Sequence, residues 1–279
     1  MRSFKTTDTI KVSGHKIAYL RKGSGETMLL IHGITAYSFI WRNLVDSLSN
    51  VYDVICVDLM GCGDSDRPLN FSYSLKQHSK FLNEFIIKLD IKKFHFIGHD
   101  VGGGIGQIFA VNYSDKLFSL ILINSVGYDC WPVQPILAMR IPIIRQLAMA
   151  TLDMGVFKLI VNRAVYNKKH VTEELMSYFW KPMKSEKGRK AFLHFAKCLN
   201  NKNLMDIAED LKKITLPVLI IRGDGDIYLD SSICKKLHDE IQGSTLLRIP
   251  TGGHFIQEDE PEMIVHHIKT FLSEKVNVC

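Results

Sequence analysis

The sequence predicts an α/β fold in which a mostly parallel central sheet is covered by helices on both faces. Apolar runs of strand length alternate with helical patterns up to Asn124, and the same alternation resumes at Leu216. This alternation is typical of parallel sheets, because each crossover between parallel strands needs a helix that packs on one face. The chain has 279 residues, of which 46% are hydrophobic, so it can bury the core that this fold requires.

The first elements are short and rich in β-forming residues. Two runs at residues 7–12 and 15–20 flank Ser13 and Gly14, a pair that favours a tight turn, so they predict a hairpin. An apolar strand, a helix, a further strand and a glycine-rich turn follow, and we expect them at residues 27–31, 38–49, 51–59 and 61–68.

The middle of the chain repeats the helix and strand periods. Apolar residues recur at helical spacing over residues 75–89 and 102–113, and strands are expected at residues 93–97 and 118–123. Right-handed crossovers bring the carboxyl ends of parallel strands to one edge of the sheet. Functional side chains of open α/β sheets gather at that edge.

The segment from Lys93 to Gln107 joins an apolar run to a glycine cluster and a helical pattern, with Asp100 at the joint. Gly98 and Gly102 lie two positions before and after Asp100, which indicates a nucleophile elbow, a sharp turn that raises its pivot side chain above the sheet edge. The usual pivot is serine, whereas an ionised aspartate attacks without a base to deprotonate it. A dinucleotide fingerprint would need glycine at Gln107, and the chain has no P-loop motif, so no cofactor is expected.

Residues 128–213 are predicted to form a helical cap inserted between two parts of the core, residues 1–127 and 214–279. Prolines punctuate helical patterns throughout this insertion. Its run at 136–161 is apolar enough to suggest a membrane span, but five residues interrupt the run, namely Arg140, Pro142, Arg145, Asp153 and Lys158. Amphipathic helices over the sheet edge account for it better, and no membrane span is expected.

The last segment contains a strand that ends at residue 222, followed by a helix, a strand and a helix at 231–241, 245–249 and 260–272. Asp224 and Asp226 follow the first of these strands, and His254 follows the second. Asp100, Asp226 and His254 thus occur in the chain order nucleophile, acid and base, each after a strand. They are the predicted catalytic residues, with Asp224 as an alternative acid.

With this order of residues, the chain from about residue 7 onward resembles the α/β-hydrolase fold family. Its aspartate elbow is similar to the elbows of haloalkane dehalogenases and epoxide hydrolases. The resemblance favours Asp226 over Asp224 as the acid. The pair His32-Gly33 resembles the oxyanion loop of the family, which implies that the backbone N–H groups of Ile34 and Val101 face the developing charge.

The resemblance also implies a two-step reaction. Asp100 would attack an electrophilic carbon to form an alkyl ester, and His254, held by Asp226, would activate a water that hydrolyses this ester. The expected substrate is a small, mostly apolar electrophile of haloalkane or epoxide type, with water as co-substrate.

The chain departs from both branches of the family. Ile34 stands where dehalogenases have a halide-binding asparagine and Val101 where they have a tryptophan, and neither side chain can donate to a halide. Thr35 breaks the H-G-x-P pattern of epoxide hydrolases. The candidates for substrate binding therefore lie in the cap: Trp131 through its indole N–H, and Tyr128, Tyr166 and Tyr178 as donors to an epoxide oxygen.

Two alternatives stay open from the sequence. Attack of a carboxylate on an acyl carbon would give a mixed anhydride, so a carboxylesterase or lactonase would instead use His254 and Asp226 as a general base on water. A non-catalytic module with a capped pocket for a small ligand is the other alternative, because a fold does not guarantee chemistry.

The composition speaks against several other classes. The net charge of +6, from 35 basic and 29 acidic residues, is spread without a polybasic block, so it does not indicate nucleic acid binding. The six cysteines form no C-x-x-C pair, so we expect neither a metal cluster nor a disulfide framework. Free thiols and the lack of an apolar signal region at the start predict a cytoplasmic protein.

Overall fold

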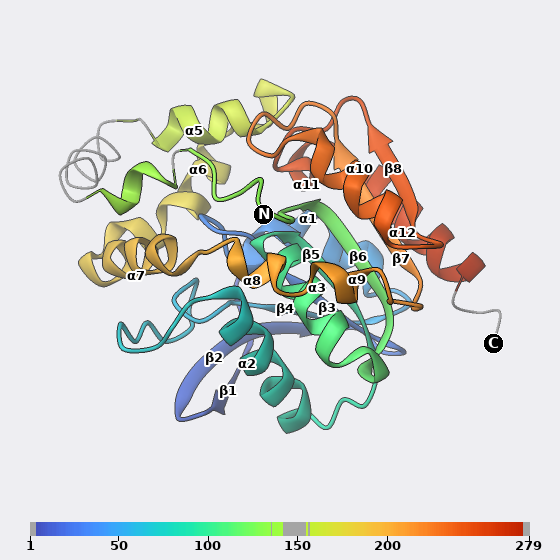
Figure 1. Ribbon diagram of the computed structural model, residues 1–279. Helices are drawn as coiled ribbons and strands as arrows, with labels where there is room; N and C mark the ends of the chain where they lie inside the picture. Colours follow the sequence, from blue (N-terminus) through green and yellow to red (C-terminus); the bar gives the residue numbers. More distant parts are fainter. Residues whose placement is uncertain (1–3, 135, 142–154, 156, 276–279) are drawn as a thin grey trace.

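The computed structural model describes residues 4–134, 136–141, 155 and 157–275 (Figure 1). The strands are β1 Asp8–Val12, β2 His15–Lys22, β3 Thr27–Ile31, β4 Asp53–Val57, β5 Phe94–Asp100, β6 Leu117–Ser125, β7 Val218–Gly223 and β8 Thr245–Ile249. Over the described ranges they form one sheet in the order β1-β2-β4-β3-β5-β6-β7-β8. The β1–β2 and β2–β4 pairs are antiparallel and the other pairs are parallel, which confirms the predicted mostly parallel sheet.

The strands at the centre of the sheet are almost completely buried, as expected when helices cover both faces. Every residue of β4 and β5 is buried, whereas in β1, at the edge, only Val12 is. The β1–β2 hairpin pairs Val12 with His15 across Ser13 and Gly14. These two turn residues have φ values of 47° and 82°, which confirms the tight turn predicted from their sequence.

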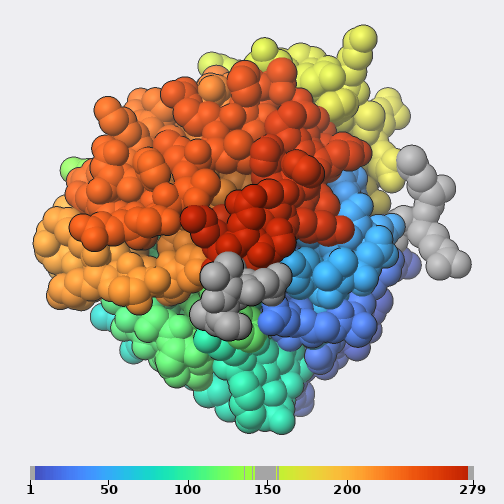
Figure 2. Space-filling view, turned by 90° about the vertical axis from the view of Figure 1, so that its right-hand side faces the viewer, coloured from blue at the N-terminus to red at the C-terminus, as the bar shows by residue number. Residues whose placement is uncertain are grey.

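Helices cover both faces because the crossovers run in both directions along the sheet. The chain moves from β3 outward to β4 through α1, Arg42–Leu48, and returns past β3 to β5 through α2, Leu75–Lys88. Right-handed crossovers in opposite directions place α1 and α2 on opposite faces. α3, Val101–Asn112, packs beside α2, and α12, Pro261–Lys275, packs beside α1. Figure 2 shows α12 in red against the light blue segment that contains α1.

Two further α-helices and two 3₁₀ turns belong to the described part of the core. α10, Ser231–Glu240, packs on β7, and α11, Ile256–Asp259, lies between β8 and α12 in the chain. Two 3₁₀ turns precede α1 and β6 at Ser38–Trp41 and Ser114–Lys116.

Helices also form the segment between β6 and β7, which is called the insertion from here on. They are α5 Phe157–Ala164, α6 Glu173–Trp180, α7 Glu186–Cys198, α8 Lys202–Met205 and α9 Ala208–Leu211, with 3₁₀ turns at Ala138–Arg140, Lys168–His170 and Pro182–Lys184. The side chains of Thr172 and Ser185 each accept a hydrogen bond from the backbone N–H three residues later. These bonds cap the first turns of α6 and α7, where no backbone acceptor is available.

The insertion has two parts. α5, α6 and α7 lie to one side of the sheet in Figure 1, whereas α8 and α9 pack against α3 of the core. Residues 142–154 of the apolar run at 136–161, which include Pro142, Arg145 and Asp153, lie outside the described residues. In the described part of the chain, no helix has both the length and the apolar character needed to cross a bilayer.

Candidate active site

Asp100 lies at a sharp turn between β5 and α3. Its φ and ψ angles of 53° and −121° are outside the regions that side chains usually adopt, so the turn holds local strain. A Cβ at Gly98 would lie 2.4 Å from the Gly102 carbonyl oxygen, and a Cβ at Gly102 would lie 2.2 Å from the Ile31 carbonyl oxygen. Both positions therefore need glycine, because α3 closely approaches β5 at Gly98 and the end of β3 at Ile31.

Two backbone N–H groups face the Asp100 carboxylate. The Ile34 N–H donates to Oδ2 of Asp100 at 3.0 Å, and the Val101 N–H also bonds the carboxylate. A Cβ at Gly33 would come within 2.6 Å of Asp100 Oδ2, so glycine is required for this loop to approach the carboxylate. The pair of N–H groups forms the geometry of an oxyanion hole, and the resting carboxylate itself occupies it.

His254 contacts Asp226 and not Asp224. Nδ1 of His254 lies 3.0 Å from Oδ2 of Asp226, while Asp224 bonds Arg248 at 2.8 Å. The other oxygen of Asp226 accepts from the backbone N–H groups of Tyr228 and Leu229 at 2.8 and 3.1 Å. A proton on Nδ1 shared with Asp226 leaves Nε2 of His254 as the basic nitrogen.

The charges of Asp100, His254 and Asp226 shift one another's pKa values. Burial raises the pKa of Asp100 to about 6, although the charge of His254 and the two backbone N–H groups oppose this. Burial lowers the pKa of His254, but the charge of Asp226, its hydrogen bond and the charge of Asp100 outweigh burial, so this pKa lies above its ordinary value. Burial raises the pKa of Asp226, and the charge and hydrogen bond of His254 with the charge of Arg222 outweigh it, so Asp226 stays ionised.

A pocket lies over Asp100 and His254. It contains about 470 Å³ of space, part of it open to solvent. Its other described lining residues come from the oxyanion loop, the insertion and the loops after β7 and β8, and are Ile34, Thr35, Val133, Gln134, Ile136, Ile160, Tyr228, Leu229 and Phe255. Most of them are apolar, so the pocket favours an apolar ligand.

None of the four predicted cap residues is among the described residues that line this pocket. Tyr128 is buried, and its hydroxyl donates to Glu240 of α10 at 2.8 Å. The Tyr178 ring stacks on Phe39 with centroids 5.3 Å apart, and its hydroxyl accepts from the Phe4 N–H. Both side chains pack the insertion against the core.

The other two cap candidates, Tyr166 and Trp131, have different surroundings. Tyr166 is half exposed and its ring approaches Gly225. Trp131 is buried, and its indole N–H has no partner among the described residues.

Tyr228 is the pocket tyrosine that the sequence reasoning missed. Its ring meets the His254 ring edge-on with centroids 5.5 Å apart, and its hydroxyl donates to the Ile160 carbonyl oxygen at 3.0 Å. Its position two residues after Asp226 could have indicated that it lines the pocket, because a residue that close to the predicted acid lies at the same edge of the sheet.

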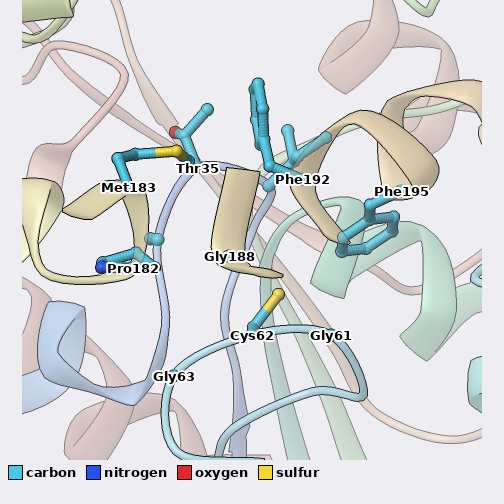
Figure 3. Close-up of a pocket in the computed structure, with 11 residues that line it drawn as sticks. Thr35, Gly61, Cys62, Gly63, Pro182, Met183, Gly188, Phe192 and Phe195 are labelled. Atoms are coloured by element: carbon cyan, nitrogen blue, oxygen red, sulfur yellow. The ribbon is translucent and has the colours of Figure 1, made fainter. Parts of the chain in front are cut away.

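A second apolar pocket shares Ile34 and Thr35 with the first one (Figure 3). It has about 310 Å³ of space, part of it open to solvent, and lies between the loop after β4 and the insertion. In Figure 3 the Cys62 thiol points from that loop toward α7 at Gly188. The insertion contributes Pro182, Met183, Gly188, Phe192 and Phe195, and the loop after β3 contributes Ala36 besides Ile34 and Thr35. Burial raises the pKa of the Cys62 thiol to about 12, so this thiol acts as an apolar wall.

The described residues contain no group of three or more histidine, cysteine, aspartate or glutamate side chains that could hold a metal ion. The described cysteines carry free thiols, namely Cys56, Cys62, Cys130, Cys198 and Cys234.

The chain is similar to known proteins along most of its length. The family model described as "alpha/beta hydrolase fold" matches residues 26–261. The chain is 27% identical over 276 residues to a cis-3-alkyl-4-alkyloxetan-2-one decarboxylase of Shewanella oneidensis, covering 94% of this chain and 86% of the relative. It is 25% identical to haloalkane dehalogenase 2 of Mycobacterium bovis, covering 89% and 88% of the two chains. It is 26% identical to epoxide hydrolase 3 of Xenopus tropicalis, covering 95% and 77%.

Among solved structures, the epoxide hydrolase CorEH superposes with a TM-score of 0.85 at 19% identity, covering 96% of this chain and 98% of the other. This likeness concerns the fold.

Proposed function

The chain belongs to the α/β-hydrolase fold family and is an enzyme related to haloalkane dehalogenases and epoxide hydrolases. On this premise we propose that it opens a small, mostly apolar electrophile through an alkyl ester on Asp100. Hydrolysis of this ester by water that His254 activates completes the reaction. Water is thus the co-substrate.

The main support for this proposal is that Oδ2 of Asp100 itself occupies the oxyanion hole. Because the Ile34 N–H already bonds Oδ2, the tetrahedral centre that these N–H groups would stabilise is the carboxyl carbon of Asp100. A general-base esterase would need the same N–H groups for the carbonyl oxygen of its substrate. The arrangement therefore supports covalent catalysis more than the esterase alternative.

In the first step, a lone pair of Asp100 Oδ1 forms a bond to the electrophilic carbon. The bond from this carbon to the leaving atom breaks, and the leaving atom departs with the electron pair, as a halide or as an alkoxide that takes a proton from water. Only ionised Asp100 is needed for this step.

In the second step, water attacks the carboxyl carbon of Asp100 while Nε2 of His254 takes a proton from the water. The N–H groups of Ile34 and Val101 stabilise the negative charge on Oδ2. Collapse of the intermediate expels the alkoxide, which receives the proton from His254, and the Asp100 carboxylate is regenerated.

The leaving group is the open part of this proposal. Neither Ile34 nor Val101 offers a side-chain donor to a halide, and the hydroxyl of Tyr228 is bonded to Ile160. A strained oxygen ring needs less help because ring opening releases strain. The relative from Shewanella oneidensis acts on an oxetan-2-one, so a β-lactone belongs beside haloalkanes and epoxides among the substrates to test.

The test is a parallel screen that measures halide release, diol formation and β-lactone or ester consumption. A single turnover of any substrate found should then be run in H₂¹⁸O. The proposal expects ¹⁸O in the Asp100 carboxylate after the first turnover, because water attacks that carboxyl carbon. Label that appears only in the product would support the general-base alternative.

The pH dependence of the two steps should differ. Alkylation is expected to weaken as the pH falls through about 6, because Asp100 must be ionised to attack. As the pH falls, hydrolysis should weaken sooner than alkylation, because His254 must be neutral and its pKa is raised. In the alkyl ester the charge of Asp100 is gone, so Asp226 is the main cause of this raised pKa. Rapid-quench mass spectrometry between pH 5.5 and 8.5 should show more alkyl ester near pH 6 than at pH 8. Identical pH profiles for both steps would contradict these assignments.

The second pocket predicts a preference for substrates with an apolar arm that passes Ile34 and Thr35. Cys62→Leu fills this pocket without changing charge, so it should reduce kcat/KM for long-chain substrates while leaving short ones unaffected. Each methylene group buried in the pocket should raise kcat/KM by about fourfold. Kinetics across a homologous series of alkyl epoxides measures the effect, with Cys130→Leu as the matched control, because Cys130 is exposed and lines neither pocket. Equal chain-length profiles in both variants would show that the arm lies elsewhere.

A further inference from the structure

Asn124 lies near the end of β6, between the loop that carries Asp226 and the loop that carries His254. It is buried, with 2% of its surface exposed. In the pairing of β5 with β6, His99 is opposite Ile123 and Asp100 is opposite Ser125, so Asn124 is the extra residue of a bulge. A bulge beside an active site re-aims a side chain that regular pairing would hold elsewhere.

The re-aimed amide of Asn124 joins both loops. Its Nδ2 donates to the carbonyl oxygens of Gly253 and His254 at 2.8 and 3.0 Å. Its Oδ1 accepts from the N–H of Gly223, the last residue of β7, at 2.9 Å. The hydrogen bonds of this one side chain therefore join the end of β7, which precedes Asp226, to the loop that carries His254.

Only a few residue types suit this position. The φ angle of Asn124 is 39°, in the left-handed region where asparagine, aspartate and glycine are tolerated best. Aspartate would present a carboxylate to two carbonyl oxygens, and glycine would have no side chain. Asparagine alone combines this backbone with a donor for one loop and an acceptor for the other.

His99 adds a second bond to the same carbonyl. Its Nε2 lies 2.8 Å from the His254 carbonyl oxygen, and burial lowers the pKa of His99 to about 3, so the ring is neutral and Nε2 carries the proton. The His254 carbonyl thus accepts from two buried donors, and its backbone is fixed relative to β5 and β6.

We propose that Asn124 is a positioning residue that holds the His254 loop in register with the Asp226 loop, so that the imidazole meets the alkyl ester on Asp100. This inference rests on the proposed function, and it assigns Asn124 to the second chemical step alone. Asn124 does not contact Asp100 through its side-chain bonds, so alkylation does not depend on it.

The expected result for Asn124→Gly, which keeps the backbone angle and removes the amide, is a separation of the two steps. The rate constant for alkylation should change by less than about twofold, whereas ester hydrolysis should slow by about 10²-fold, the usual cost of misplacing a catalytic group by about 1 Å. Rapid-quench intact-mass spectrometry at pH 8.5 measures both rates. Asn124→Asp retains the shape of the side chain and the acceptor but loses the donor, so its ester hydrolysis should slow in the same way. This variant replaces Asn124→Gly in the test if the glycine variant does not fold.

Gln107→Leu is the matched control. The buried Gln107 amide bonds Ser125 and Val126 at the same end of β6 without a bond to either loop. Its removal should lower stability without changing the ratio of the two rates. If Gln107→Leu and the Asn124 variants change both rates equally, Asn124 is merely structural and the proposal is overturned.

A readout without substrate separates this inference from the proposed function. Among the described residues, Asp226, Asp100, Arg222, His99 and Tyr228 are ionisable groups around the His254 ring. An imidazole loosened from Asp226 should titrate at a lower pH, so NMR titration of His254 should give a lower pKa in Asn124→Gly than in the wild type or in Gln107→Leu. An unchanged His254 pKa rejects the positioning role even if no covalent ester is ever found.

Discussion

His254→Gln is expected to trap the enzyme as an alkyl ester. Alkylation needs only ionised Asp100, whereas hydrolysis needs the imidazole, so the intermediate should accumulate while turnover falls by about 10²–10⁴-fold. With a substrate that the wild type turns over, intact-mass spectrometry should show the variant heavier by the alkyl group, and peptide mapping should locate this mass at Asp100. Asp100→Ala should stay unmodified under the same conditions.

The pH dependence of trapping gives an independent check on the same variant. The charge of His254 lowers the pKa of Asp100 in the wild type, so its removal should raise that pKa further above about 6. The acid limb of alkylation should therefore move to higher pH in His254→Gln. The absence of any mass shift, with a substrate that the wild type consumes, would reject covalent catalysis and favour His254 as a general base on water.

Asp100→Asn is expected to abolish turnover and to stabilise the fold at neutral and alkaline pH. The pKa of Asp100 is about 6 in the folded chain against 3.8 as its ordinary value, so the ionised form is held at a cost of up to about 3 kcal/mol. Because the folded pKa is the higher one, this loss of stability grows as the pH rises from 3.8 to about 6 and is complete above it. The isosteric amide carries no charge and escapes this cost.

Thermal unfolding at pH 8 and pH 4.5 measures this effect. We expect Asp100→Asn to unfold about 5 °C above the wild type at pH 8, with a smaller difference at pH 4.5. A matched comparison is Asp226→Asn, which should destabilise at pH 8, because Asp226 is ionised at a lowered pKa and bonds His254. A stabilisation by Asp100→Asn that is equal at both pH values would contradict the burial of an ionised carboxylate.

Local sequence determined the sheet and the placement of the three candidate catalytic residues. Strands and helices have different periods, so their alternation can be read without knowing what packs against what. Gly98 and Gly102 mark a turn whose geometry excludes a Cβ, and the structure contains that turn. Asp226 and His254 follow strands of one parallel sheet, and such strands end at a common edge, so the chain order of the motifs was enough to expect that they meet.

The strand order and the walls of the pocket depended on distant contacts. The sequence does not say that β4 pairs with β2 on one side and β3 on the other. It also does not say which face of the insertion meets the core, so Tyr128 and Tyr178 looked as suitable as any other side chain. Their hydroxyls are bonded to Glu240 and Phe4, which lie far away in the chain.

Asn124 shows most clearly what the sequence alone could not reveal. A single asparagine at a strand end is ordinary in sequence, and nothing local announces a bulge. Its role appears only when β6 lies beside β5 and β7, because its partners, at Gly223, Gly253 and His254, are about 100 to 130 residues away along the chain. The sequence by itself determined the sheet, the elbow and the order of the acid and base. Only the tertiary structure decided which side chains line the pocket and which hold the acid and base together, because those contacts join segments that are far apart in the chain.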